Sequence, residues 1–406
     1  MKQISPPELL DRIRALRAGG PLMRRLGDAQ GVYLVGGAVR DLLLGGEPMD
    51  LDLVVEGDAV ALTSRLGGDA VVHDRFGTST VTFDGFSYDL ARARSETYPK
   101  PGALPDVSPA SLAEDLLRRD FAVNAIAVAL GGPDPGELSS VAGALKDLDA
   151  RSLRVLHERS FIDDPTRLLR LARYRSRLGF EIEPRTRELA ADAVRANALE
   201  TVTGPRIGTE LRLLAREPDP VRGLRALAEL ELEHAIHPGF GLADEQLALR
   251  ALELLPTDHR RDRLALALAT RRIAVGELTR LLDALGFEAG DREAIVDAAT
   301  KADALAQALD GAERPSQIAQ AASGAAPELV AVAGALGPAQ AAREWLTRLR
   351  GVELEIDGGD LLAAGVPEGP AVGRALRAAL AAKLDGRAEG RQAELAAALE
   401  ASRATG

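Results

Sequence analysis

The stretch GVYLVGGAVRDLLLGGEPMDLDLVVE, residues 31–56, places a glycine pair ahead of two acidic residues. The segments VYLV and DLDLV predict two short β-strands, and the strand period of two puts Asp50 and Asp52 on one face of the second strand. Residues 38–44 between them are predicted to form a helix that begins just after the glycine pair. The start of such a helix directs free backbone N–H groups and the positive end of the helix dipole toward a bound phosphate.

Two carboxylates beside a phosphate site indicate a divalent metal ion. Gly36 and Gly37 lack a Cβ and allow a phosphate to approach the backbone closely. Mg²⁺ prefers oxygen ligands and commonly binds one or two carboxylates together with substrate phosphates, as Asp50 and Asp52 could. Each feature alone also fits a tight turn before an edge strand with solvated acids. Their combination predicts nucleotidyl transfer.

The composition of the whole chain excludes several classes of protein. Its 406 residues, 46% hydrophobic and 27% charged, are typical of a globular protein of about two to four domains. The N-terminal segment is charged and amphipathic, and no run of about 18 apolar residues occurs, so we expect a cytoplasmic protein with no signal peptide and no membrane partner. The absence of cysteine excludes disulfides, zinc–thiolate sites and cysteine nucleophiles.

The charge distribution restricts where RNA could bind. A net charge of −11 argues against a chain coated in nucleic acid. Residues 151–225, however, contain 16 Arg, no Lys and 11 acidic residues, which is a local excess of five positive charges. Arginine-rich solvated helices would give the same excess, so charge alone leaves both interpretations open.

The first ninety residues are predicted to form a mixed α+β head. Residues 1–30 are expected to contain one helix, which ends at a break formed by the glycines 19 and 20. Asp89, at the end of a later strand, is a third carboxylate that could reach the metal pair, whereas His73-Asp74 lacks an upstream histidine to complete a metal site. The head would have about five strands in all. Beyond residue 56, the expected elements are a helix at 58–66 and strands at 70–72, 78–83 and 87–90.

Residues 92–109 and the helix that follows contribute further polar groups. This stretch is rich in Pro and Gly and is predicted to be a loop without regular structure, a kind of segment that is often functional. Ser111 and Glu114 predict a capping box at the start of the next helix. After that helix, Arg119 offers a forked donor to triphosphate oxygens, and Asp120 can accept hydrogen bonds from ribose hydroxyls. An exposed helix end is the simpler alternative.

The second half of the chain is predicted to be helical. In FIDDPTRLLRLARYR, residues 161–175, one acid and three arginines recur at three-residue spacing, which gathers them on one helix face. These residues are Asp164, Arg167, Arg170 and Arg173. Beyond residue 216 the pattern is repeated Ala/Leu-rich amphipathic helix, and its histidines lack the spacing of metal ligands.

These motifs, in this order, resemble the DNA polymerase beta superfamily of nucleotidyltransferases, and specifically the bacterial tRNA nucleotidyltransferase and poly(A) polymerase family. The matching segments are Gly-Gly-Ala-Val-Arg-Asp with Asp-Leu-Asp, Arg-Arg-Asp followed by Phe-Ala-Val-Asn-Ala, and the helix with Asp164 and Arg167. The resemblance continues to residues 356–376 and so covers nearly the full chain. Two positions depart from the family pattern, since Asp163 and Pro205 stand where Glu is usual.

The resemblance implies an α+β fold in which a small mixed-sheet nucleotidyltransferase head is followed by an all-helical neck, body and tail. We expect the catalytic head at residues 1–145, the neck with the base-recognition helix at 146–215, the body at 216–335 and a tRNA-binding tail at 336–406. Within the head, residues 92–109 resemble the flexible loop that helps the family switch from adding C to adding A, with Arg94 and Glu96 at its usual start.

The activity that the resemblance implies is addition of CCA, from CTP and ATP, to the 3′ end of tRNA without a nucleic-acid template. The expected partners are the tRNA 3′ end, CTP and ATP, with no DNA, and the expected cofactor is Mg²⁺. Asp50 and Asp52 would hold two Mg²⁺ ions about 3.5–4 Å apart, and Asp89 completes the expected catalytic set. The expected substrate-binding residues are Gly36, Gly37, Arg40, Arg119, Asp120, Asn124, Asp164, Arg167, Arg170 and Arg173.

Alternative activities stay open at this point. The nearest is an enzyme that adds only A after a separate CC-adding partner, because the motifs do not visibly separate these activities. A CC-only enzyme is less favoured, since such enzymes lack the flexible loop that residues 92–109 resemble. Poly(A) polymerase and an inactive RNA-binding relative are further alternatives, and the presence of Asp50, Asp52 and the Arg-Arg-Asp motif argues against the inactive one.

Overall fold

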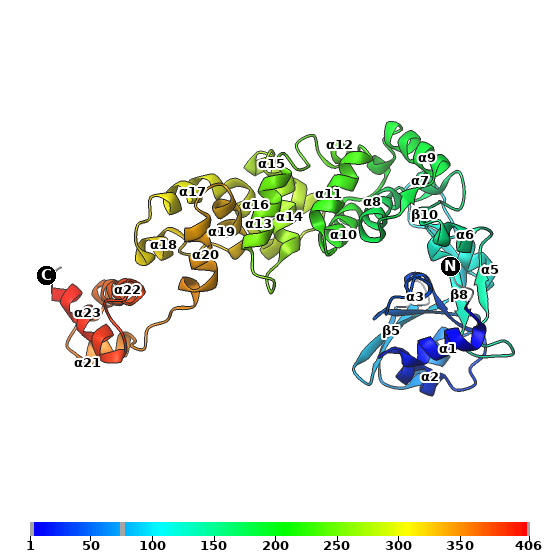
Figure 1. Cartoon of the computed structure of the whole chain (residues 1–406), viewed down its shortest axis with the longest axis horizontal. Coiled ribbons are helices and arrows are strands. Elements are labelled where there is room, and N and C mark those ends of the chain that lie inside the picture. Colours follow the sequence, from blue (N-terminus) through cyan, green and yellow to red (C-terminus); the bar gives the residue numbers. More distant parts are fainter. Residues whose placement is uncertain (1–3, 74–77, 404–406) are drawn as a thin grey trace. The chain divides into compact units, whose positions relative to one another are not determined.

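The computed structural model describes residues 4–73 and 78–403, so Asp74 of the His73-Asp74 pair lies outside the described residues. The chain divides into two compact units. Unit 1 comprises residues 1–203 with 230–235, and unit 2 comprises residues 204–229 with 236–406. Unit 1 contains the β-sheet, and unit 2 consists of helices, which confirms the predicted α+β class with a helical remainder (Figure 1). The finer boundaries at 145, 215 and 335 stay predictions.

A seven-stranded mixed sheet organises unit 1, in the order β3-β4-β5-β2-β1-β8-β9 (Figure 1). Only β2 and β5 pair in parallel within it, and the other neighbours are antiparallel. The expected five strands are present. β8 and β9 extend the sheet and were not predicted, because such short segments show little alternation. The strands are β1 (Val32–Val35), β2 (Leu51–Val55), β3 (Asp69–His73), β4 (Thr78–Phe83), β5 (Phe86–Arg92), β8 (Ile126–Ala129) and β9 (Leu138–Ser140).

The N-terminal segment differs from the prediction of one helix. It forms α1 (Pro6–Ala15) and α2 (Gly19–Leu26), separated at Leu16, whose backbone is extended with φ −61° and ψ 143°. The glycine pair therefore begins a helix instead of ending one. A Cβ at Gly19 would lie 1.8 Å from the Ile13 carbonyl oxygen, so only glycine lets α2 start this close to α1.

Helices pack on the sheet through apolar side chains. α3 (Gly37–Leu43) follows β1 directly, and α4 (Ala59–Leu66) starts at Asp58, whose carboxylate accepts the Ala61 N–H. Val39 of α3 is fully buried, and burial of a side chain of this size stabilises the fold by about 1.5–3 kcal/mol. This packing fixes the β1–α3 turn that contains the glycine pair.

Residues 92–109 form a β-hairpin, which corrects the prediction of an unstructured loop. β6 (Arg94–Thr97) pairs antiparallel with β7 (Asp106–Pro109), so backbone hydrogen bonds order the two ends of the segment. The tip is held as well, because the Gly102 N–H donates to the Asp163 carbonyl oxygen at 3.2 Å. Gly102 has φ +70°, and a Cβ there would lie 2.2 Å from the Thr201 hydroxyl oxygen. The prolines that suggested a loop lie at the tip and the end of the hairpin.

The remaining elements of unit 1 include the predicted capping box. Ser111 caps α5 (Leu112–Leu117) reciprocally with Glu114, as the sequence predicted. The short strands β10 (Ser152–Leu153) and β11 (Glu181–Ile182) pair in parallel. The other elements are η1 (Ala122–Asn124), α6 (Ala144–Asp149), α7 (Ser160–Asp163), α8 (Thr166–Leu178), α9 (Pro184–Arg195) and η2 (Ala198–Thr201).

Unit 2 contains helices joined by short turns. α14 and α19 are the most deeply buried, since nearly every residue of each is inaccessible to solvent. α12 (Glu233–Ile236) lies where the two units divide. The other elements up to residue 351 are α10 (Gly204–Ala215), α11 (Pro220–Glu229), α13 (Glu245–Leu254), α14 (Arg261–Thr270), α15 (Val275–Ala284), α16 (Ala289–Thr300), α17 (Ala302–Asp310), α18 (Pro315–Ala321), α19 (Pro327–Ala335), α20 (Ala339–Thr347) and η3 (Leu349–Gly351).

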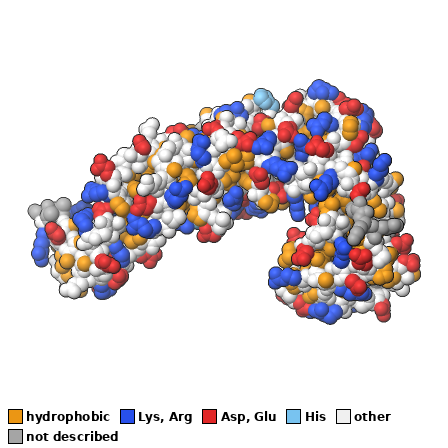
Figure 2. Space-filling view, in the orientation of Figure 1, with side chains coloured by type: hydrophobic (Ala, Val, Ile, Leu, Met, Phe, Trp, Pro, Cys, Tyr) orange, Lys and Arg blue, Asp and Glu red, His pale blue; other side chains and the backbone are white. Residues whose placement is uncertain are grey.

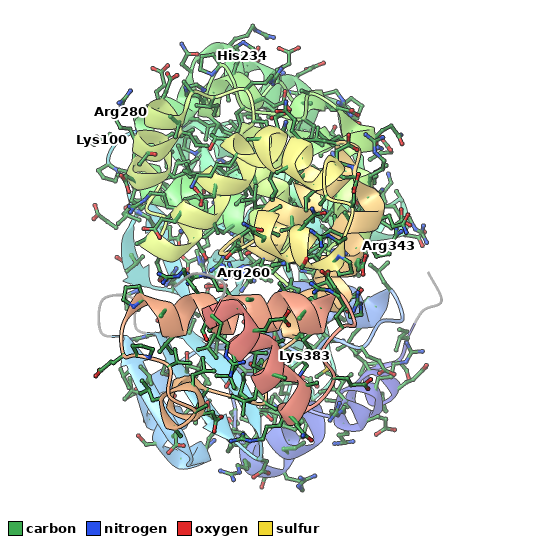
Figure 3. All side chains as sticks on the ribbon, turned by 90° about the vertical axis from the view of Figure 1, so that its left-hand side faces the viewer. Lys100, His234, Arg260, Arg280, Arg343 and Lys383 are labelled. Atoms are coloured by element: carbon green, nitrogen blue, oxygen red, sulfur yellow. The ribbon has the colours of Figure 1, made fainter. Side chains whose placement is uncertain are left out.

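The last three helices have a small apolar core of their own. They are α21 (Gly358–Ala363), α22 (Pro370–Leu384) and α23 (Arg391–Arg403), and they surround Leu361, Ala379 and Ala398 (Figure 1). Lys383 of α22, labelled in Figure 3, forms an ion pair at 2.6 Å with the fully buried Glu394 of α23. Because a buried carboxylate needs a partner, this ion pair fixes α22 on α23.

The surface of unit 2 carries both signs of charge. Figure 2 shows Lys and Arg side chains interspersed with Asp and Glu side chains over the visible face of its helices. Many of these charges are paired, as Arg225 is with Glu245 and Arg271 with Asp303. No helix within residues 4–73 and 78–403 is long and apolar enough to cross a membrane.

Candidate active site

The parallel pairing of β2 and β5 brings the predicted carboxylates together. Asp52 on β2 lies directly opposite Asp89 on β5, and Asp50 immediately precedes β2. All three residues are exposed, and Asp89 accepts a hydrogen bond from the Thr80 hydroxyl at 2.6 Å. Desolvation in the cleft and the Asp89 and Asp50 carboxylates raise the pKa of Asp52, although the Arg119 guanidinium opposes this. A positive ion would relieve the repulsion between these acids.

The glycine pair lies beside these carboxylates at the start of α3. Gly36 has φ +71°, a conformation that favours glycine, and α3 begins at Gly37. A Cβ at Gly36 would lie 3.0 Å from Arg119 Nη1. The positive φ and the close approach of the arginine side chain both favour glycine here.

A cavity of about 300 Å³ joins the carboxylates, the glycine pair and the arginine-bearing helix. Eight of the ten expected substrate-binding residues line it, and Arg40 and Arg173 do not. A second cavity of about 360 Å³ borders Asp52 and Asp89 and shares Arg118 and Arg119 with the first. The lining of the first is Gly36, Gly37, Asp52, Glu96, Tyr98, Arg118, Arg119, Asp120, Asn124, Asp164, Arg167, Arg170 and Tyr174.

Arg40 lies behind the cavity wall, which differs from the expectation that it grips the triphosphate. Its side chain is 1% exposed and donates to Asn124 Oδ1 at 2.6 Å and to Asp41 Oδ1 at 2.8 Å. The guanidinium also lies over the Tyr174 ring, 5.5 Å from its centroid. Because these contacts occupy it, Arg40 as placed supports Asn124 and does not reach a substrate.

Asp120 is buried and already paired. One carboxylate oxygen accepts from the Phe121 N–H at 2.8 Å and from the Asn124 side-chain amide at 3.0 Å, and the other accepts from Arg170 Nε at 2.9 Å. Burial disfavours its charge, but Arg170 and Asn124 outweigh this and hold the pKa of Asp120 well below its usual range. A ribose hydroxyl would have to compete with these donors, so ribose selection by Asp120 stays a prediction.

Asp164 and Arg167 lie side by side on the cavity at the start of α8. Asp164 Oδ1 accepts from the Thr166 hydroxyl at 2.6 Å, which anchors the carboxylate at the first turn. Arg167 is 4% exposed and donates to the Ser160 hydroxyl at 2.7 Å and to the Arg118 carbonyl oxygen at 2.6 Å. Both groups are therefore fixed before any base arrives. Arg173, on the same helix, instead packs over the Tyr174 ring, 4.8 Å from its centroid.

The sequence analysis missed several residues that build this site. Asp115 is fully buried and forms ion pairs with both Arg118 and Arg119. The signal in the sequence is an acid that precedes two arginines by three and four residues on a predicted helix. Glu96 accepts from Arg118 Nη1 at 3.1 Å and from the Tyr98 hydroxyl at 3.0 Å. Burial and Glu96 raise the pKa of Tyr98 to about 12, so its phenol stays protonated as a donor.

The donor set suits an oxygen-preferring metal ion that is shared with a substrate. Within the described part of the chain, no group of three or more His, Cys, Asp or Glu side chains is arranged to hold a metal ion alone. Asp52 nevertheless offers an exposed carboxylate at the cavity, and the exposed Asp50 lies two residues before it. Mg²⁺ typically takes one or two protein carboxylates and completes its shell with phosphate oxygens and water, so these residues fit it.

Comparisons with known proteins agree with this geometry. The Poly A polymerase head domain matches residues 32–154, and the probable RNA and SrmB-binding site of polymerase A matches residues 179–242. An A-adding tRNA nucleotidyltransferase from Geobacter sulfurreducens is 43% identical over 53% of this chain and 25% of its own length. The chain spans only 25%, 54% and 32% of three A-adding relatives.

Other relatives match over nearly their whole length. A CC-adding tRNA nucleotidyltransferase from Deinococcus radiodurans is 38% identical over 87% of this chain and 85% of its own. The solved structure of a Thermotoga maritima CCA-adding enzyme complexed with tRNA has a TM-score of 0.74 at 28% identity, covering 98% of this chain and 99% of that one. The sheet with its paired carboxylates, the glycine turn and these matches together show that the chain belongs to the bacterial tRNA nucleotidyltransferase and poly(A) polymerase family.

Proposed function

We propose that this protein is a template-independent nucleotidyltransferase that adds CCA to the 3′ end of tRNA from CTP and ATP, releasing pyrophosphate. The observation that carries the proposal is one cavity in which Asp52 and the glycine pair face the base-reading pair, Asp164 and Arg167. Solved relatives described with ATP, with CTP and with tRNA support the choice of substrates.

The phosphates would bind at the start of α3. The backbone at Gly36 and Gly37 would face the triphosphate, and Arg119, which packs on this turn, would donate to its oxygens. Asp50 and Asp52 would hold Mg²⁺ at the same place. Such an ion would supply activation of the terminal 3′-hydroxyl and stabilisation of the leaving pyrophosphate. The second cavity, which borders Asp52 and Asp89, is the corresponding place for the RNA 3′ end.

The base would be chosen by Asp164 and Arg167. Cytosine and adenine both present an amino donor beside a ring-nitrogen acceptor, which suits a carboxylate acceptor next to a guanidinium donor. Uracil and guanine place an acceptor against Asp164 and a ring N–H against Arg167. Because each mismatched buried group costs about 1–3 kcal/mol, two mismatches would exclude UTP and GTP by several hundredfold.

A second candidate is CC addition alone. The Deinococcus CC-adding relative covers most of this chain, whereas the Geobacter A-adding relative covers about half of it. The hairpin at residues 94–109 favours CCA addition, since the family's flexible loop assists A addition. The two candidates differ in a single step, the transfer of the final A.

One assay separates these activities. Transcripts of tRNA ending before CCA, at C and at CC are offered CTP and ATP separately with Mg²⁺, and product lengths are read on a sequencing gel. CCA addition requires that the first two transcripts be extended with CTP and the third with ATP. Failure of ATP to extend the CC transcript would leave CC addition, failure of CTP would leave A addition, and no extension of any transcript would refute the proposal.

A further inference from the structure

Asp115 occupies an unusual position for an acidic residue. It lies on α5 and is 0% exposed. One carboxylate oxygen accepts from Arg118 Nε at 3.0 Å and Nη2 at 2.7 Å, and the other accepts from Arg119 Nη2 at 3.0 Å. The Arg94 backbone N–H donates to it as well, at 3.3 Å. A buried carboxylate therefore holds two consecutive arginine side chains and the root of the hairpin.

These two arginines lie at the proposed reacting centre. Arg118 and Arg119 border both cavities that meet at Asp52. Adjacent guanidinium groups repel each other, and without a shared counter-ion their side chains would separate. Asp115 and Glu96 are two carboxylates that face three guanidiniums, those of Arg94, Arg118 and Arg119.

The Arg119 side chain also has an unused donor. Its Nε is buried and has no hydrogen-bond partner among the residues that the structure describes. Its Nη2 is held by Asp115, and its Nη1 packs on Gly36, so the guanidinium cannot turn to satisfy Nε elsewhere. A buried donor without a partner is unfavourable. Arg119 also lines the cavity, where its guanidinium can donate to a phosphate oxygen of the substrate.

We infer that Asp115 is a positioning residue for the nucleotide triphosphate: it orients Arg118 and Arg119 so that Arg119 presents fixed donors to the phosphate oxygens. The inference rests on the proposed function, because a nucleoside triphosphate is the substrate that this function requires. Asp115 does not touch the substrate. Its effect on nucleotide binding passes through the two arginines.

The test compares Asp115→Asn with a matched control, Asp147→Asn. Asp147 is likewise buried in unit 1, at 3% exposed, and accepts two hydrogen bonds from one arginine, Arg154, at 2.8 and 3.0 Å. Both variants lose one buried charge and should lower the unfolding midpoint to a similar extent. Asp115→Asn should raise the KM for CTP about 10-fold and leave kcat within about 3-fold, and Asp147→Asn should change neither.

Two further measurements distinguish positioning from a structural role. Inorganic tripolyphosphate, used as a competitive probe, should bind Asp115→Asn about 10-fold more weakly than the wild type. In the double variant Asp115→Asn with Arg119→Lys, tripolyphosphate affinity should be no lower than in Arg119→Lys alone, since both changes remove the same contact. If Asp115→Asn does not fold, Asp115→Glu, which keeps the charge, should fold and bind tripolyphosphate more weakly than the wild type.

The outcomes are separable from those of the proposed function. Wild-type affinity for tripolyphosphate in Asp115→Asn, or in Asp115→Glu where only that variant folds, would overturn the inference. The inference would also be overturned if the double variant lost as much tripolyphosphate affinity as the two single variants lose together. Absence of tRNA extension by the wild type would instead refute the proposed function, and tripolyphosphate binding to the non-extending protein would still measure what Asp115 does.

Discussion

Two clusters of acids and arginines, one in each unit, are each built around buried carboxylates but differ in what they hold. In unit 1, Asp115 and Asp120 hold arginines that line a cavity of about 300 Å³. In unit 2, Asp262 of α14 accepts from Arg260 and Arg216, and Asp291 of α16 accepts from Arg263. The second cluster joins helices that are distant in sequence and resembles an ordinary structural ion-pair network.

What separates the clusters is the balance of donors and acceptors. In the unit 2 cluster, no buried donor or acceptor of the described side chains lacks a hydrogen-bond partner. In the unit 1 cluster, Arg119 Nε is buried without one and lies beside exposed Asp52. In a structural network the buried donors and acceptors bond to one another, whereas a binding site retains polar groups that are free to bond to its ligand. Charge clustering alone would not have separated the two.

The largest effect is expected at the carboxylates that face the cavity. Asp52→Ala should lower nucleotide addition by about 1,000-fold or more, since it removes a ligand of the proposed metal ion. tRNA binding should persist, because Asp52 is exposed and its loss leaves the core intact. Single-turnover extension and a filter-binding assay measure the two properties. Turnover near the wild-type rate would refute the metal assignment.

A smaller effect is expected at Asp120, a buried residue of the cavity wall. Asp120→Asn keeps the shape of the side chain but removes the charge that pairs with Arg170, so kcat/KM should fall by about 30–100-fold. The unfolding midpoint should fall as well, because the ion pair between the partly exposed Arg170 guanidinium and a buried carboxylate is lost. Steady-state kinetics and thermal unfolding on one preparation measure both. Loss of stability with unchanged kcat/KM would place Asp120 with the structural clusters.

The hairpin tip should have a smaller and more selective effect. Gly102→Ala forces a Cβ against Thr201 and should loosen the tip from Asp163, which precedes Asp164, the residue proposed to read the base. We expect A addition to fall about 10-fold and C addition to change less, as measured on transcripts ending at CC and before CCA.

A matched control for this variant is Gly85→Ala. Gly85 also has positive φ, +81°, but a Cβ there meets no atom within 4 Å, so this change adds backbone strain without the clash. Its ratio of A addition to C addition should equal that of the wild type. If both variants change this ratio equally, the docking of the tip has no role in nucleotide choice.

The smallest effect on activity is expected in the unit 2 cluster. Burial disfavours the charge of Asp262, but hydrogen bonds from Arg260 and Arg216 prevail and lower its pKa to about 2. Asp262→Asn should therefore destabilise the protein by about 2 kcal/mol at pH 7 and leave nucleotide addition within about 3-fold of wild type.

The pH dependence of that loss follows from the sign of the shift. A lowered pKa contributes stability that is present above the unfolded value near 4 and is lost as the pH falls toward 2. The stability difference between wild type and variant should therefore shrink over this range, as denaturant unfolding at several pH values would show. A constant difference would mean that Asp262 acts through packing and not through its charge.

Elements whose signal is local could be predicted from the sequence. The β1–α3–β2 order, the alternation that produced β4 and the capping box at Ser111 are all present as predicted, because each depends on neighbours within a few residues. The same local spacing identified the glycine turn and the acids that face the cavity.

Which polar side chains form hydrogen bonds with each other depends on the tertiary structure. Arg40 bonds to Asn124 and Arg170 to Asp120, pairs separated by 84 and 50 positions along the chain. Spacing cannot predict such pairs, since they depend on the order of strands in the sheet and on how α8 packs beside it. For the same reason the hairpin at 94–109 was not predicted, because its order comes from cross-strand hydrogen bonds and from a tip held by Asp163. The sequence shows which interactions each side chain is able to form. The partners that lie beside it in the fold determine which of these interactions it forms.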